Sequence, residues 1–330
     1  MTRDLPADRP SFGNAICPMD HRGGDINEAA FRTLIRYMAD GGTTVCVGGP
    51  HATEFIHLNA AERLRVWELA VDELGGRAPV SAIPVGPTSN RDMVATFRTV
   101  EAMGFDAAQL YPNAHGGYGG DGLFVAEVER YYRDVLDATT LPLFITNYHR
   151  GEIIDSPTKR VPHALLLRLL DAYPGRIGGF GVIWRGAEDL QELLAGVDGR
   201  VHVRVSGALD WHAAMEAGAH GFHSIQQSFV PRLCSGMMAA FHAGDHATSR
   251  RLSDRIAALN AVIHHPDRAY PRSIKPTLRY LGFDVGDLRP PHYSLGAAAD
   301  AALWVDLATI DFAETEQLPA GGPVALRPAD

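Results

Sequence analysis

The stretch that decides the fold spans residues 43–63 and reads TTVCVGGPHATEFIHLNAAER. Its first part, Thr43 to Val47, is an apolar run typical of a buried strand, and the part from Asn59 onward is amphipathic and predicts a helix. The loop from Gly48 to Glu54 therefore joins the C-terminal end of a strand to the helix that follows it. Because α/β barrels carry their chemistry on loops of this kind, we expect this loop to form part of an active-site rim.

Strand-like and helix-like segments alternate in the same way along most of the chain. The expected strands are Asn14–Met19, Thr43–Val47, Val80–Val85, Ala107–Tyr111, Leu143–Asn147, Ile177–Val182, Val201–Val205 and Gly221–Ile225. Eight such units of roughly 25 to 30 residues predict an α/β fold of the (β/α)8 TIM-barrel type. A doubly wound sheet is the main alternative, but no glycine fingerprint follows the first strand.

Local signals mark the helices between these strands. Asn59 and Glu62 have the spacing of a capping box, and Ser89 with Asp92 predicts a second capped start. The helix after Asn59 is expected to place one set of side chains on its buried face: Leu64, Val66, Trp67, Ala70 and Val71. Further helices are expected over Asn27–Met38, Val125–Leu136, Pro162–Ala172, Ala187–Leu194 and Trp211–Ala217.

From Val230 onward the pattern is helical only, and the helical segment is too long for a single barrel helix. Helices are expected over Met237–His242, Thr248–Ile263 and Ile274–Leu281. The sequence therefore predicts a barrel over residues 1–226 and a C-terminal helical appendage over residues 227–313. Residues 314–330 are rich in Pro, Gly and Ala and are expected to be a loosely ordered tail.

Composition excludes several classes of function. The 330 residues carry a net charge of −9 with both signs scattered, so a nucleic-acid partner is not expected. No window approaches the roughly 18 uninterrupted apolar residues of a membrane span, and the polar N-terminus does not resemble a signal peptide. Cys17, Cys46 and Cys234 lie far apart, which predicts reduced core residues. These features favour a soluble cytoplasmic protein.

Polar residues gather where the expected strands end. They are Asp20, His21, His51, Glu54, Tyr111, Asn113, Asn147, Tyr148, His149, Trp184, Arg185, Ser206, His223 and Gln226. His51 and His149 titrate near neutrality, so they are candidates for general base and acid beside a carbonyl. Arg185 is the candidate anchor for a substrate carboxylate, and the backbone N–H groups of His51 and Ala52 are candidate oxyanion donors.

Each of these candidates also has a purely structural interpretation. Glu54 can accept hydrogen bonds from backbone N–H groups and fix its own loop, and Arg185 can pair with Glu188 at the surface. His51 and His149 can bond to their loops or to solvent. His223 is interpreted first as a satisfied core histidine.

Several of these motifs resemble the dihydrodipicolinate synthase and N-acetylneuraminate lyase family of pyruvate-handling aldolases. Glu54, Leu58, Glu62 and Arg63 keep the spacing of the family's Gly-Thr-Thr-Gly-Glu loop and the helix after it. Ser206-Gly207, the segment Gly218–Gly221 and Lys275-Pro276 resemble further family signatures. The resemblance implies a (β/α)8 barrel that acts on a small-molecule substrate as a homo-oligomer, a tetramer or a dimer.

The family's chemistry uses a lysine on strand six, which forms an imine with a keto acid. The chain has only two lysines, Lys159 and Lys275, and neither is expected to point into the barrel. Gly181 is the position expected to correspond to the family lysine. No amine is therefore expected at that position to act as the nucleophile.

Other family positions differ as well. The tyrosine expected in a Tyr-Asn pattern on strand five corresponds to Thr146-Asn147, and Tyr148 is the nearest catalytic replacement. His51 and Ala52 stand where the loop normally holds two threonines. The tyrosine that family members borrow from a neighbouring subunit falls near Asn113 or Ala114, so it is open whether subunits share active sites.

These observations predict a lyase-like enzyme that acts on a small keto acid or carboxylate without an imine, by histidine acid–base chemistry and without a cofactor. The expected catalytic residues are His51, His149, Glu54 and Tyr148, and the expected substrate-binding residues are Ala52, Asn147, Arg185, Ser206 and Tyr111. One alternative is a metal-assisted aldolase or dehydratase with a divalent ion held by His51, Glu54, His115 and His149. Another is a non-catalytic binding or regulatory protein on the same barrel.

Overall fold

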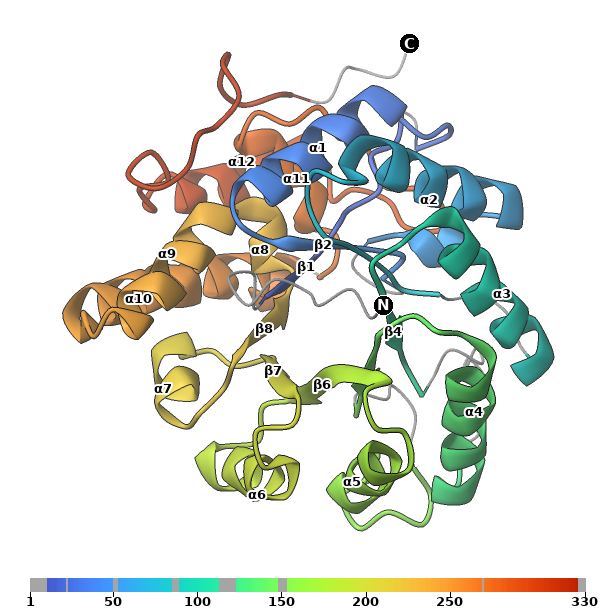
Figure 1. Cartoon of the computed structure of the whole chain (residues 1–330). Helices are drawn as coiled ribbons and strands as arrows, with labels where there is room; N and C mark the ends of the chain where they lie inside the picture. The colour runs from blue at the N-terminus through green and yellow to red at the C-terminus, as the bar shows by residue number, and fades with distance from the viewer. Residues whose placement is uncertain are drawn as a thin grey trace. The chain divides into compact units, whose positions relative to one another are not determined.

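The computed structural model describes residues 11–21, 23–49, 53–84, 89–112, 123–147, 153–268 and 270–325. The strands follow one another in chain order around a closed parallel barrel (Figure 1). They are β1 (Phe12–Asn14), β2 (Thr44–Val47), β3 (Val80–Ala82), β4 (Ala107–Leu110), β5 (Leu143–Thr146), β6 (Ile177–Ile183), β7 (His202–Ser206) and β8 (Gly221–Ser224). The predicted (β/α)8 fold is confirmed.

Helices alternate with these strands as the sequence predicts. They are α1 (Glu28–Asp40), α2 (Ala60–Leu74), α3 (Asn90–Met103), α4 (Val125–Ala138), α5 (His163–Ala172), α6 (Ala187–Val197) and α7 (Trp211–Glu216). After β8 the helices are α8 (Gln226–Phe229), α9 (Pro231–His242), α10 (His246–Ile263), α11 (Ile274–Tyr280) and α12 (Ala297–Leu307). Short 3-10 turns cover Phe55–His57 and Pro266–Arg268.

Contacts divide the chain into two compact units. The first unit contains Gly75–Ala208 and Ala213–His223, and it carries β3 to β7 and most of β8. In this unit α4, α5 and α6 lie outside the strands (Figure 1). The second unit contains Phe12–Leu74, Leu209–His212 and the chain from Ser224 onward. The expected division into a barrel and an appendage near residue 226 stays a prediction.

The capping signals in the sequence are confirmed. The Asn59 N–H donates to Glu62 Oε2 at 2.8 Å and the Glu62 N–H donates to Asn59 Oδ1 at 3.0 Å, which is a reciprocal capping box. The Asp92 N–H donates to Ser89 Oγ at 3.1 Å at the start of α3. The buried face of α2 differs at two positions, because Leu64 is exposed and Val71 is half-buried, whereas Leu69 and Leu74 are buried.

The first strand is shorter and lies earlier than the expected Asn14–Met19. β1 ends at Asn14, although residues 15–19 are buried and apolar. The Cys17 N–H donates to the Thr53 carbonyl of the loop after β2, and Pro18 has no N–H to offer a sheet. A buried apolar segment of this kind looks like a strand in the sequence because burial alone produces the same pattern.

The start of the C-terminal tail is held more firmly than its composition suggests. Glu316 is buried and its carboxylate accepts from the Leu233 N–H at 2.7 Å, which satisfies a free donor at the start of α9. The Tyr37 hydroxyl donates to the same carboxylate at 2.7 Å. The loose order expected from residue 314 therefore does not apply to its first residues.

Two expectations from composition concern the described residues directly. Cys17, Cys46 and Cys234 are free and fully buried, as predicted for core thiols. Burial raises the pKa of Cys17 to about 12, so this thiol stays protonated at neutral pH. Among the helices of the described chain, none has the length and hydrophobicity needed to cross a membrane.

Candidate functional site

Half of the residues expected at the site fall in the described chain. His51, Ala52, His115, Tyr148 and His149 lie outside it. Glu54, Tyr111, Asn147, Arg185 and Ser206 lie within it. Glu54 belongs to the second compact unit and the other four to the first, so the two groups are described separately.

Glu54 follows β2 and forms a buried ion pair. Its Oε2 lies 2.5 Å from Lys275 Nζ, and both side chains are almost fully enclosed. The other carboxylate oxygen accepts from the Arg289 N–H at 2.7 Å. Glu54 itself adopts a left-handed conformation with φ of 63°, which is uncommon for a residue with a side chain. The backbone turn after β2 is thus held by contacts from the C-terminal part of the chain.

Lys275 belongs to this contact and is not a surface lysine of the C-terminal helices. Its ammonium also donates to the Asp287 carbonyl at 2.6 Å. Burial lowers the pKa of Lys275, and the neighbouring Glu54 carboxylate opposes that shift. The sequence prediction did not anticipate this partnership, although Lys275 is one of only two lysines in the chain.

Asn147 and Ser206 connect neighbouring strands in the first unit. Asn147 Oδ1 accepts from the Ile183 N–H at 3.0 Å and extends the pairing between β5 and β6. Ser206 Oγ donates to the His223 carbonyl at 2.8 Å and joins β7 to β8. Each of these side chains fixes the spacing of two strand ends.

Arg185 lies after β6 and faces solvent. Its side chain is 40% exposed and pairs with Asp189 at 3.5 Å, one turn along α6. The structural alternative anticipated an ion pair at this position, and the partner is Asp189 where Glu188 was expected. An exposed pair of this kind contributes little to stability.

Tyr111 contacts His223 through the interior of the barrel. Its hydroxyl lies 3.4 Å from His223 Nδ1. Tyr111 follows the end of β4 and His223 belongs to β8, and these two strands are not neighbours in the sheet. Burial, assisted by the charge of Arg204, lowers the pKa of His223 to about 4. His223 is therefore a neutral imidazole at pH 7 on the inner face of the barrel.

A row of residues in strand register crosses the same inner face. Thr146 on β5 pairs with Gly181 on β6, Gly181 pairs with Arg204 on β7, and Arg204 pairs with Gly221 on β8. Because side chains two residues apart share a face, His223 and Gly221 point the same way. Arg204 thus lies on the inner face between two glycines.

Arg204 is a buried cation that the sequence prediction missed. Only 3% of it is exposed, and its guanidinium lies over the Phe144 ring at 4.4 Å from the centroid. The signal was present in the sequence, because His202, Arg204 and Ser206 alternate with Val201, Val203 and Val205. A period of two with polar residues on one face predicts a polar inner surface on this strand.

The glycines of β6 have different surroundings. A Cβ on Gly179 would lie 2.6 Å from the His202 carbonyl oxygen and 2.7 Å from the Phe144 ring, so only glycine fits. A Cβ on Gly181 would meet only the Thr146 side chain among the described residues, at an ordinary 3.5 Å. The position above Gly181 is therefore open on the described side of the barrel, and the Thr146 Oγ1 beside it is buried with no hydrogen-bond partner among the described residues.

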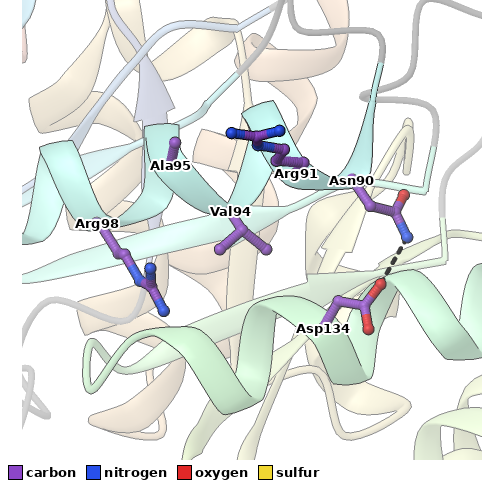
Figure 2. Close-up of a pocket in the computed structure, with 6 residues that line it drawn as sticks. All are labelled: Asn90, Arg91, Val94, Ala95, Arg98 and Asp134. Atoms are coloured by element: carbon purple, nitrogen blue, oxygen red, sulfur yellow. Dashed lines mark hydrogen bonds between the residues drawn. The ribbon is translucent and has the colours of Figure 1, made fainter.

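A separate pocket lies outside the strands in the first unit (Figure 2). It has a volume of about 420 Å³ and lies between α3 and α4. Its lining residues are Asn90, Arg91, Val94, Ala95, Arg98 and Asp134. None of them was expected at the site, and Asn90 Nδ2 donates to Asp134 at 2.7 Å across the pocket (Figure 2).

A metal centre finds no support in the part of the chain that the structure describes, because no group of three histidine, cysteine, aspartate or glutamate side chains converges there. Three of the four expected ligands, His51, His115 and His149, lie outside those residues. The fourth, Glu54, is bound to Lys275 and the Arg289 N–H.

The closed parallel barrel with polar residues on its inner face defines the class of (β/α)8-barrel proteins, which bind small molecules at the strand ends. Within that class the chain belongs to the dihydrodipicolinate synthetase family, whose model matches residues 9–151 and 180–309. The second matched segment begins one residue before Gly181.

Relatives of similar sequence agree with this assignment. The chain is 27% identical over 256 residues to a 4-hydroxy-tetrahydrodipicolinate synthase from Nitrobacter hamburgensis, covering 77% of this chain and 81% of the relative. It is 28% identical over 274 residues to a 4-hydroxy-tetrahydrodipicolinate synthase from Methylobacterium radiotolerans, covering 82% of this chain and 85% of the relative.

Solved structures of the family share the fold. A putative dihydrodipicolinate synthetase from Pseudomonas aeruginosa superimposes with a TM-score of 0.79 at 23% identity, over 91% of this chain and 98% of that one. A prophage protein of the dihydrodipicolinic acid synthase family from E. coli K12, solved in complex with pyruvate, gives a TM-score of 0.78 at 19% identity, over 92% and 98%.

Proposed function

We propose that this protein is a lyase that acts on a small keto acid or carboxylate by aldol cleavage, aldol condensation or dehydration, without forming a lysine imine. Membership of the dihydrodipicolinate synthetase family supports the substrate class. The observation that carries the proposal is β6, Ile177–Ile183, which holds Gly181 opposite Thr146 and contains no lysine.

The two lysines of the chain are poorly suited to imine chemistry. Lys275 is engaged by Glu54 and the Asp287 carbonyl. Lys159 lies in the connection between β5 and α5 and does not belong to a strand. In an aldolase without an imine, the electron pair of the breaking carbon–carbon bond moves onto the carbonyl group of the keto acid and forms an enolate. A cation or preorganised hydrogen-bond donors must then stabilise the enolate oxygen.

Proton transfer in this proposal belongs to histidines. His51 and His149 remain the candidates on the rim, with Glu54, Tyr148, Ala52, Asn147, Arg185, Ser206 and Tyr111 as the proposed supporting residues. Among the described residues, His223 lies on the inner face of the barrel, where the Tyr111 hydroxyl contacts it. The proposal also includes a homo-oligomer, as the family resemblance implies, and a cytoplasmic location, as the composition favours.

Borohydride trapping tests the absence of an imine. The protein is incubated with pyruvate and sodium borohydride, and its intact mass and peptide map are measured. No pyruvate-derived mass increase is expected, while a family member with the strand-six lysine serves as the positive control. A stoichiometric adduct on Lys275 or Lys159 would overturn the proposal, and with only two lysines the peptide map identifies the site without ambiguity.

A panel of keto acids and aldehydes tests the lyase activity itself. Turnover or thermal stabilisation by at least one keto acid is expected. If no compound in a broad panel produces either effect, the protein is a non-catalytic member of the family. Activity that disappears on chelation and returns with zinc or manganese would favour the metal-assisted alternative.

A further inference from the structure

We propose that Arg204 and Thr146 form the carboxylate-binding site of this protein on the inner face of the barrel, above Gly181. The proposal rests on the proposed function, because it names the part of a small 2-oxo acid that the barrel recognises. Arg185, the anchor expected from the sequence, is replaced in this role by a buried arginine.

The first argument is the placement of the charge. Arg204 is directly in register with Gly181, the position expected to correspond to the family lysine. A lysine at that position would supply a positive charge to the interior, and here the neighbouring strand supplies it. The guanidinium stays charged at any relevant pH and offers a planar fork that matches the two oxygens of a carboxylate.

The second argument is the support given to this cation. The Phe144 ring lies against the Arg204 guanidinium at 4.4 Å, and Gly179 provides the room that Phe144 needs. The aromatic face restricts the guanidinium to one plane, and such preorganisation lowers the entropic cost of binding. A glycine on each side, Gly181 and Gly221, keeps the adjacent strands from filling the space around the arginine.

The third argument is an unsatisfied hydroxyl. Thr146 Oγ1 is buried and has no hydrogen-bond partner among the described residues, which is costly for a polar group unless a ligand satisfies it. Its Cβ and Cγ2 lie 3.7 and 3.5 Å from the position that a Gly181 Cβ would take. The hydroxyl therefore stands beside the open position, within reach of a small ligand over Gly181.

The chemistry of these groups selects the ligand. One guanidinium and one neutral hydroxyl suit a compound with a single carboxylate and an adjacent carbonyl oxygen. Neutral His223 adds no second positive charge, because burial, assisted by Arg204, lowers its pKa to about 4, well below pH 7. The site should therefore discriminate strongly between pyruvate and methyl pyruvate, its neutral analogue in which a methyl ester replaces the carboxylate.

The test measures binding of pyruvate and methyl pyruvate by isothermal titration calorimetry to the full-length protein and five variants. Arg204→Met is expected to weaken pyruvate binding by at least 30-fold and to leave the weak binding of methyl pyruvate unchanged. Arg204→Lys is expected to bind pyruvate more weakly than the parent and more tightly than Arg204→Met, because lysine keeps the positive charge and lacks the planar fork. Arg168→Met, an exposed arginine paired with Glu129, is the control and is expected to bind like the parent.

Thr146→Val separates a binding role from a structural one. Removing an unsatisfied buried hydroxyl is expected to raise the unfolding midpoint in the absence of ligand, while weakening pyruvate binding several-fold. A structural role would lower the midpoint instead. This variant also decides the question if Arg204→Met fails to fold.

The outcomes distinguish this inference from the function on which it rests. If the parent protein binds no keto acid or carboxylate at all, the proposed function fails. If the parent binds pyruvate and Arg204→Met binds it equally well, or if Arg185→Met is the variant that abolishes binding, the Arg204 site is wrong while the function stands.

Discussion

His223 shows how a single buried residue couples proton binding to stability. Its pKa falls from the ordinary value of 6.5 to about 4 in the folded protein, because burial and Arg204 both oppose a positive charge there. Between these two values the unfolded chain binds more protons at this residue than the folded one does. Stability from this residue is therefore present above pH 6.5 and is lost as the pH falls toward 4.

Replacing His223 by glutamine should remove this part of the pH dependence. We expect the parent to lose about 3 kcal/mol more unfolding free energy than His223→Gln between pH 7 and pH 4. Urea unfolding at a series of pH values measures the difference. Tyr111→Phe keeps the imidazole buried and should retain the parent's slope. Equal slopes for the parent and His223→Gln would contradict the assignment.

The polar residues near the strand ends show what a sequence can and cannot provide. Glu54, Tyr111 and Ser206 were identified from their positions at strand ends, and the alternation of His202 and Arg204 with valines was visible. What the sequence cannot provide is the partner of each group. The contact between Glu54 and Lys275 joins positions more than 200 residues apart, and no local pattern encodes it.

Among the elements, β6 is the one whose sequence is most unusual for a strand. Glycines weaken a strand interior, yet three of its seven residues are glycine. Gly179 is required by close contact with Phe144 and the His202 carbonyl, whereas Gly181 is not required by packing against the described residues. Glycine is therefore sterically required at position 179, whereas at position 181 it borders open space.

Alanine at each position should separate these causes. Gly181→Ala is expected to change the unfolding free energy by less than about 1 kcal/mol, because its Cβ meets Thr146 at an ordinary distance. Gly179→Ala is expected to lose about 2 kcal/mol or more, since its Cβ would overlap backbone and ring atoms. Chemical denaturation of the two variants side by side is the measurement. A larger loss at Gly181 than at Gly179 would show that the inner face is packed differently.

Some boundaries of helices and strands are set by contacts within a few residues, and others by contacts with distant parts of the chain. Helix starts at Asn59 and Ser89 were predictable because a cap is made within four residues of chain. The end of β1 was not, because Cys17 donates to a loop that follows another strand. Burial was predicted correctly there, and only the direction of the backbone hydrogen bonds was missed.

At the scale of the whole molecule, the chain after β8 supports the loop after β2 within the second unit. Lys275 from α11 and the Arg289 N–H bind the two oxygens of Glu54. The Arg289 side chain donates to Glu62 at 2.8 Å at the start of α2. The C-terminal segment therefore holds Glu54 and the start of α2 in place, and its helices do more than cover a surface.

A double-mutant cycle measures this support. Lys275→Met leaves the Glu54 carboxylate buried without its cation, so we expect a loss of about 3 to 5 kcal/mol of unfolding free energy. Adding Glu54→Gln removes the stranded charge and keeps an acceptor for the Arg289 N–H, so the double variant should recover at least about 2 kcal/mol of that loss. Urea denaturation of the parent, both single variants and the double variant supplies the four values.

Breaking the exposed Arg200–Asp171 pair with Arg200→Met is the matched control, and it should cost no more than about 1 kcal/mol. If Lys275→Met costs no more than this control, the buried pair does not hold the β2 loop. If the double variant is less stable than Lys275→Met alone, the loss comes from poor packing of the methionine and not from the unpaired carboxylate. Recovery in the double variant is the result that only a buried electrostatic contact explains, because glutamine restores no packing around residue 275.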